Sequence, residues 1–324
     1  MDITVRDLVQ SDAAALSALF ERCYGKTYGS PVFYDIPALE DYIASRTLRS
    51  VVATDSQTIL GHTGITIRYA DALICETGNT VVDPAARGHG LLRRLGAALK
   101  ERVLRDSFFG YMHYPTTAHE IMQKASVSGG GREMGVMLAY VDDSTEYKAV
   151  EQRAGRLAAT VAFQPFKALP AAQVYFPMRY RDLMQHLYRE ADLTRTTFAE
   201  NVSPSMPKHA EIESHYYAAR HLLSLRAAQI GQDLLPQVSG AIDQLTPAVT
   251  HIDLPLDDSA VDSTVNELVQ AGFFFCAILP AFARSDLLRL QKLITPLPED
   301  FTPDVINPVA QRLCRFMQED AKQS

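Results

Sequence analysis

Residues 81–95 read VVDPAARGHGLLRRL, and this stretch decides the fold of the 324-residue chain. An apolar strand ends at Pro84, a turn containing Gly88 and Gly90 follows, and a helix begins directly after it. Glycines have no Cβ atom to hold a ligand away from the backbone, and the start of a helix presents free N–H groups and a positive dipole end. The stretch therefore predicts a phosphate or pyrophosphate site; the alternative is a tight turn without a ligand.

The same stretch resembles the coenzyme A-binding motif of the GNAT acyltransferase superfamily. In that motif a strand ending Val-x-Pro precedes Gln or Arg, two residues, Gly, one residue, and Gly or Ala. Val82 and Pro84 match the strand end, and Gly88 and Gly90 match the two glycines, whereas Ala85 stands where Gln or Arg is usual. The resemblance implies acetyl-CoA or another acyl-CoA as cofactor, its pyrophosphate held by the loop amides. The residues it places there are Val82, Ala85, Arg87, Gly88, His89, Gly90 and Leu91.

Composition limits the class of protein. The length allows two domains, and 47% hydrophobic with 21% charged residues is typical of a globular protein. A net charge of -7, with no long run of Lys and Arg, argues against a nucleic-acid partner. No apolar run is long enough to cross a membrane, so we expect a cytoplasmic protein. Four separated cysteines without a C-x-x-C pair predict free buried thiols and no metal site.

Strands and helices alternate through residues 1–145. The predicted strands are 3–6, 49–54, 58–69, 73–82, 108–114 and 133–141, and the predicted helices are 11–23, 36–46, 91–103 and 118–128. This element order is similar to that of a GNAT domain. It implies an α/β (α+β) fold with a mixed, mostly antiparallel twisted sheet flanked by helices.

A change of composition over residues 146–170 predicts a domain junction, which gives domains 1–150 and 151–324. The strand predicted at 157–166 would close a sheet shared by both halves. Later predicted elements are helices 178–190, 236–245 and 259–270, a loop 192–207, and strands 249–254, 273–279 and 287–293. The order strand, helix, Gly-Phe, strand, strand repeats the plan of residues 108–141. We therefore interpret the second half as a degenerate, tandem GNAT-like domain without the glycine loop and without a CoA site.

The second motif of the family, N-x-x-A-x-x-x-Y-x-x-x-G-F, is altered here. Its alignment places His119 at the Asn position and Ser126 at the Tyr position. The resemblance implies that the residue at the Tyr position donates a proton to the leaving thiolate. A serine hydroxyl is a weaker acid than a phenol, whereas histidine titrates near neutrality, so His119 is preferred over Ser126 as the donor. The alternative role of His119 is to orient the acceptor. The other candidates are His113, Tyr111 and Tyr114 on the preceding strand.

Glu76 is the predicted general base, because it is the only acid in the strand that leads to the glycine loop. The alternatives are a solvated side chain at a sheet edge or a pair with Arg68 across the hairpin. Glu133 begins a strand, where a solvated charge is expected. The tract from His209 to His221, rich in His and Tyr, is interpreted as a domain-interface patch or part of a substrate wall.

These observations predict acyl-CoA-dependent N-acyltransfer, most simply N-acetylation, to a small-molecule amine by direct attack. A first alternative is an enzyme that processes acyl-CoA or a carrier-protein thioester by O-acyl transfer or decarboxylation. A second is a non-catalytic tandem scaffold that binds acyl-CoA or a protein partner.

Overall fold

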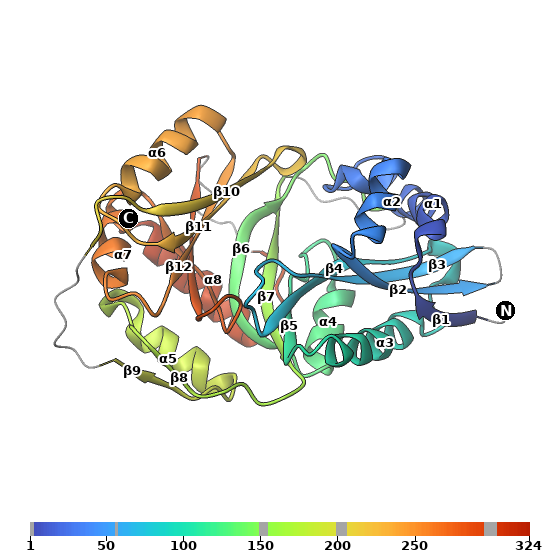
Figure 1. The fold of residues 1–324 in the computed structure, drawn as a ribbon, viewed down its shortest axis with the longest axis horizontal. Helices are drawn as coiled ribbons and strands as arrows, with labels where there is room; N and C mark the ends of the chain where they lie inside the picture. The colour runs from blue at the N-terminus through green and yellow to red at the C-terminus, as the bar shows by residue number, and fades with distance from the viewer. Residues whose placement is uncertain (1–2, 56–57, 149–154, 199–205, 295–302) are drawn as a thin grey trace.

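The computed structural model describes residues 3–55, 58–148, 155–198, 206–294 and 303–324. Within these residues a 12-stranded sheet runs through the whole molecule, beside a separate 2-stranded sheet (Figure 1). The strand order of the large sheet is β1-β2-β3-β4-β5-β7-β6-β13-β14-β12-β11-β10. Most neighbours are antiparallel, and helices cover both faces, so the predicted mixed α/β class is confirmed.

The N-terminal part of the sheet begins with four antiparallel strands, to which β5 adds in parallel. The strands are β1 (Ile3–Asp7), β2 (Leu48–Asp55), β3 (Ile59–Thr66), β4 (Ile74–Val82), β5 (Gly110–His113), β6 (Arg132–Val141) and β7 (Leu157–Pro165). The predicted boundary at residue 150 falls within 149–154, outside the described residues. β7 lies beyond it in sequence and pairs with both β5 and β6.

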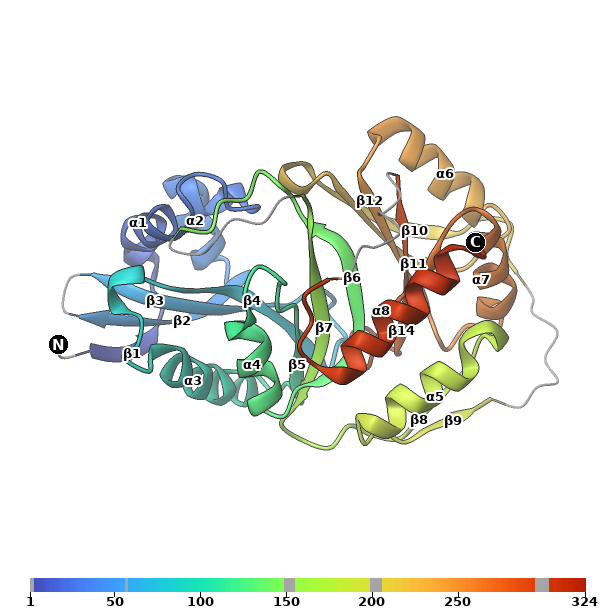
Figure 2. The ribbon, with the colours of Figure 1, turned by 180° about the vertical axis from the view of Figure 1, so that it is seen from behind.

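The helices of this half bury the two faces of its strands, as the alternation of side chains along β2 requires. Helices α1 (Ala13–Tyr24) and α2 (Ile36–Ala44) pack on the face that contains Val52. Helix α3 (Leu91–Arg105) packs on the opposite face, against Val51. Figure 2 shows the two helix layers on either side of β2 and β3. Helix α4 (Glu120–Ser128) lies between β5 and β6 in the chain.

The C-terminal half repeats part of this plan in mirror order. Its β13-β14-β12-β11-β10 order matches β6-β7-β5-β4-β3, and β11 and β12 are parallel as β4 and β5 are. Its strands are β8 (Ala172–Val174), β9 (Arg195–Thr197), β10 (Glu211–Tyr217), β11 (Leu222–Gln229), β12 (Val249–Pro255), β13 (Phe274–Leu279) and β14 (Leu287–Leu293). Its helices are α5 (Arg181–Glu190), α6 (Leu234–Leu245), α7 (Val261–Gln270) and α8 (Pro308–Ala321).

The two halves join where β6 pairs with β13, at Gly135 opposite Ala277. A Cβ atom on Gly135 would lie 2.2 Å from the Cys276 carbonyl oxygen, so no larger residue fits this seam. The sheet is therefore continuous across both halves.

Three features of the fold differ from the sequence prediction. The tract 211–229 forms the hairpin of β10 and β11, which was not predicted, and β9 lies within the predicted loop 192–207. Helix α8 was also not predicted. It packs against β6, the strand that carries Glu133, and only 5% of Glu133 is exposed. The prediction that Glu133 is solvated is therefore wrong, and burial raises the pKa of its carboxyl to about 8.

All four cysteines are buried and free, as predicted. Among the described residues, no helix is long and apolar enough to span a bilayer.

Candidate functional site

In the N-terminal half the sheet splits between two parallel strands, β4 and β5. They pair only from Ile74–Gly110 to Thr77–His113, after which β4 continues to Val82 while the chain leaves β5 at His113. The split opens into a cavity of about 1610 Å³ that residues of both halves line. The edge of β4 beyond Thr77 therefore faces a space rather than a neighbouring strand.

Beyond the split, β4 is irregular at Asn79. Its pairing with β3 shifts register there, and Asn79 has a φ of +55°, in the left-handed region that non-glycine residues rarely occupy. Two contacts hold this backbone: His62 Nδ1 lies 2.7 Å from the Asn79 carbonyl oxygen, and Tyr28 donates to Asn79 Oδ1 at 2.7 Å. Burial lowers the pKa of His62 to about 4, so the ring is neutral and Nδ1 carries the donated proton.

The glycine turn between β4 and α3 has a fixed geometry. Asp83 accepts a hydrogen bond from the Ala85 amide at 2.9 Å and pairs with Arg22 at 2.5 Å, which anchors the start of the turn. Gly88 and Gly90 have φ values of +83° and +71°, which L side chains adopt only with strain. Helix geometry leaves the first N–H groups of α3 without partners inside the helix.

A line of glycines leaves room along one side of the cavity. A Cβ atom at Gly78, Gly88, Gly90 or Gly96 would meet no atom within 4 Å. Gly78, Gly90 and Gly96 line the cavity, and Gly88 lies in the turn between them. The residues thus fit an elongated ligand with an anionic group over the start of α3 and an arm along the free edge of β4.

The predicted cofactor residues occupy this turn unequally. Gly90 lines the cavity, and Ala85, Arg87, Gly88 and His89 are exposed around it. The Leu91 side chain is 2% exposed and lies in the core beneath α3, so only its amide can contact a ligand. Val82 is half-buried at the end of β4.

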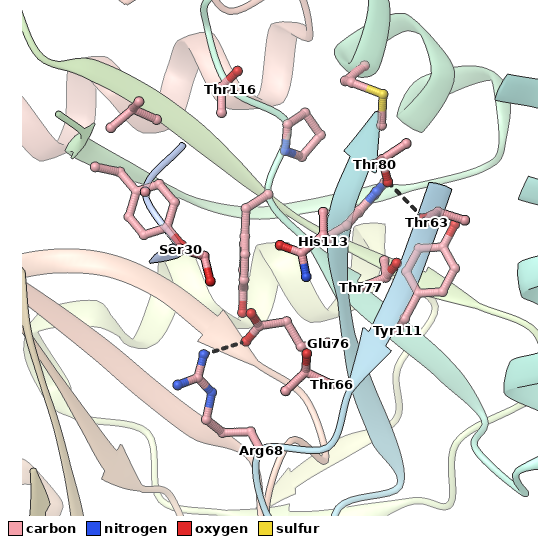
Figure 3. A pocket seen from close by; sticks show the side chains of 18 of the residues that line it. Ser30, Thr63, Thr66, Arg68, Glu76, Thr77, Thr80, Tyr111, His113 and Thr116 are labelled. Atoms are coloured by element: carbon pink, nitrogen blue, oxygen red, sulfur yellow. Dashed lines mark hydrogen bonds and ion pairs between the residues drawn. The ribbon is translucent and has the colours of Figure 1, made fainter. Parts of the chain in front are cut away.

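Glu76 and Arg68 point toward each other inside the cavity (Figure 3). Arg68 Nη2 lies 2.9 Å from Glu76 Oε2, and Arg68 Nη1 donates to the Tyr217 hydroxyl from the second half. Their side chains are 30% and 18% exposed. The pair with Arg68 therefore exists, and Glu76 also lines the cavity one residue before the last β4–β5 pair.

The structure brings two candidate donors, His113 and Ser126, into contact, and it places His119 away from both. His113 Nε2 lies 3.0 Å from Ser126 Oγ, and His113 belongs to the last β4–β5 pair before the split. Burial lowers the pKa of His113 to about 4, so this histidine is neutral near pH 7. His119 lies at the other end of α4, about 10 Å along the helix axis from Ser126, with its ring 6.3 Å from that of Tyr147.

The sequence analysis missed a buried ion pair in the second half. Arg289 donates to both carboxylate oxygens of Asp253 at 2.6 and 2.7 Å, and Arg289 lines the cavity with His251. A signal was present, because each charged residue stands between two apolar ones, Asp253 between Ile252 and Leu254 and Arg289 between Leu288 and Leu290. The two residues are also paired in register. The tract around His215 and Tyr217 also lines the cavity, in line with its interpretation as a wall.

The helix start in the second half that corresponds to the glycine turn is filled by the chain itself. Gln232 donates its amide to the Pro207 carbonyl at 3.0 Å, and the Ala210 amide donates to Asp233 at 2.6 Å. A Cβ atom on Gly231 would lie 2.3 Å from the Ala210 nitrogen. No open space equivalent to that beside Gly90 exists among these described residues.

No family model and no curated protein matches this chain. Solved structures do resemble it. The putative acetyltransferase yncA from Salmonella typhimurium, described with acetyl-CoA, is 14% identical; the match covers 53% of this chain and 98% of that one, at a TM-score of 0.43. The ribosomal-protein-S18-alanine N-acetyltransferase from Escherichia coli is 16% identical; the match covers 52% of this chain and 97% of that one, at a TM-score of 0.41. The PaiA N-acetyltransferase from Thermoplasma acidophilum, in complex with coenzyme A, is 13% identical; the match covers 51% of this chain and 100% of that one, at a TM-score of 0.38.

Proposed function

We propose that this protein transfers an acyl group, most simply acetyl, from an acyl-CoA directly to the amine of a small molecule. The observation that carries the proposal is the split between β4 and β5, which places Glu76 and the glycine turn in and beside one cavity. Direct transfer requires both substrates to meet in such a space, and the cavity is lined by both halves of the chain.

The cofactor would lie along the row of open glycines. The amides from Gly88 to Leu91 would hold the pyrophosphate, and the free edge of β4 from Gly78 to Thr80 would run beside the pantetheine arm. When bound there, the cofactor supplies a thioester carbonyl to the split. We propose one such site per chain, because residues 206–210 fill the equivalent place in the second half.

Glu76 takes the proton of the attacking amine, directly or through water, while Arg68 fixes the orientation of its carboxylate. The new C–N bond forms as the C–S bond breaks, and the electron pair leaves on sulfur. Ser126 lies at the split and can donate a hydrogen bond to that sulfur, because His113 in its Nε2–H tautomer donates to Ser126 Oγ. A thiol titrates only slightly above neutrality, so a hydrogen bond can stabilise the leaving thiolate.

The His113–Ser126 hydrogen bond supports this pair over His119 as the group that acts on the leaving sulfur. His119 lies at the N-terminal end of α4, about 10 Å along the helix axis from Ser126, whereas His113 contacts Ser126 directly. His119 would instead lie beside the acceptor, with Tyr147.

The test is acetyl-CoA turnover over a library of small amines, followed by mass spectrometry of the products, together with calorimetric titration of CoA. Amide products with an added acetyl group and one CoA per chain support the proposal. An O-acetyl product or a decarboxylated acyl-CoA would favour the other enzymatic reading. Binding of CoA without any product would favour a scaffold.

A further inference from the structure

The second half of the chain contributes several arginines to the cavity. Arg220 comes from the turn between β10 and β11, Arg226 from β11 and Arg289 from β14, while Arg68 comes from the N-terminal half. Figure 1 shows the turn between β10 and β11 reaching towards the N-terminal half.

Three of these four arginines have a carboxylate partner. Arg68 pairs with Glu76 at 2.9 Å, Arg226 with Glu213 at 3.1 Å, and Arg289 with Asp253 at 2.6 Å. In the described parts of the chain, no carboxylate lies within ion-pair distance of Arg220. Of these four arginines, Arg220 is therefore the one without a carboxylate partner among the described residues.

The neighbours of Arg220 are neutral rings. Its Nη1 donates to the Tyr140 hydroxyl at 2.7 Å, and its guanidinium lies 5.1 Å from the centre of the Tyr140 ring and 5.8 Å from that of Tyr217. The Tyr140 bond uses one of its five N–H donors, and no carboxylate of the described ranges forms an ion pair with its charge. A guanidinium in this state favours a planar anion that can accept two parallel hydrogen bonds.

The backbone that carries Arg220 is held in place. Arg156 donates to the Arg220 carbonyl at 2.6 Å and pairs with Asp142 at 2.5 Å, and the next residue, His221, has a φ of +45°. From the other half, a Cβ atom on Gly29 would lie 2.8 Å from Arg220 Nε, so a side chain there would displace the guanidinium from its present position. A fixed position of this kind reduces the ordering cost of binding an anion.

We infer that the acceptor amine also carries a carboxylate, and that Arg220 binds this group. This inference rests on the proposed function. Arg68 contacts both Glu76 and Tyr217, and the Tyr217 ring lies beside Arg220. The contacts from the proposed base to the Arg220 guanidinium thus run through two side chains, those of Arg68 and Tyr217.

The test compares free amino acids with their C-terminal amides as acceptors, because the two differ only in the anionic group. We expect the wild type to prefer the free acids by at least about tenfold in kcat/KM. In Arg220→Gln the value for acids should fall about 10- to 100-fold, the loss of a charge-assisted pair, while the value for amides stays near that of the wild type. Arg220→Lys should recover part of the preference. The control, Arg284→Gln, changes an exposed arginine outside the cavity and should change neither value.

Equal use of acids and amides by the wild type would overturn the inference. An equal loss of kcat/KM for acids and amides in Arg220→Gln, together with a fall in Tm, would show that Arg220 stabilises the contact between the two halves instead of binding the acceptor. Better use of aminoalkylphosphonates than of amino acids would replace the carboxylate with a phosphate-like group. If no amine is acylated although CoA binds, the proposed function fails by itself. The inference is then decided by thermal shift with the same acids and amides in the presence of CoA: stabilisation by acids alone, lost in Arg220→Gln, supports it, and no such difference refutes it.

Discussion

Replacing Glu76 with Gln tests the role of this carboxylate with little change of shape. Gln keeps an oxygen that can accept from Arg68 Nη2, so the geometry of the cavity wall should survive. The substituted side chain can no longer take a proton, and we expect kcat/KM for the amine to fall by about two to four orders of magnitude. The CoA dissociation constant should stay within about twofold, because Glu76 lies before the split and the glycine turn begins after Val82.

The cost to stability follows from the partial exposure of the pair. Arg68 and Glu76 are 30% and 18% exposed, between a surface pair, at about 0–1 kcal/mol, and a fully buried one. Arg68 also keeps its bond to Tyr217, so we expect a loss of about 1–2 kcal/mol and a fall in Tm of a few degrees. This loss is too small to unfold the protein.

The assay follows thiol release from acetyl-CoA at varied amine concentration and pH. The matched control is Glu213→Gln, which removes another cavity-lining carboxylate paired with an arginine but leaves Glu76 in place. A Glu76→Gln variant with wild-type kcat/KM and an unchanged pH–rate profile would refute the assignment of Glu76 as base.

Three further predictions follow from the turn, the split and the buried acid. Gly88→Val puts a side chain where the turn now leaves open space, so CoA binding should weaken at least about 100-fold in a calorimetric titration. Ser126→Ala should lower kcat about 10- to 100-fold in steady-state kinetics, and more than His119→Ala does, because only Ser126 lies at the split. The pKa of Glu133 is about 8 when folded and near 4.5 when unfolded. The folded protein therefore holds this proton longer, and the associated stability, complete below about pH 4.5, is lost progressively as the pH rises towards 8. Glu133→Gln should flatten that decline in Tm.

Each of these predictions has a control or a contrary outcome. Gly155→Val introduces the same strain, at a φ of +79° with open space around the Cβ, outside the cavity, and should leave CoA affinity unchanged. Equal affinity in Gly88→Val and Gly155→Val would remove the turn from the cofactor site. A larger loss in His119→Ala than in Ser126→Ala would restore His119 as the group at the sulfur. An identical Tm–pH curve for Glu133→Gln and wild type would show that Glu133 does not titrate in this range.

Local patterns were enough to predict the N-terminal half, because its signals lie close together in the sequence. The strand before Pro84, the two glycines and the apolar face of Leu91, Leu95 and Leu99 each specify one local conformation, and together they give β4, the turn and α3. Periodicity also predicted β12, α7, β13 and β14, whose bounds differ by at most two residues from those expected.

The parts that were missed depend on distant contacts. β10 reads EIESHYY, which has few apolar residues, and residues 213–217 of this strand line the cavity. Glu133 is buried by α8, which comes from the far end of the chain, so its own neighbours gave no sign of desolvation. The contact of Ser126 with His113 likewise joins a helix to a strand across 13 residues.

The most direct test of the central claim is a crystal structure of the protein with acetyl-CoA. Our account predicts one molecule per chain, with its pyrophosphate on the amides from Gly88 to Leu91 and its thioester in the split, within hydrogen-bond reach of Ser126. A cofactor at the start of α6, or a molecule that does not enter the split between β4 and β5, would contradict it.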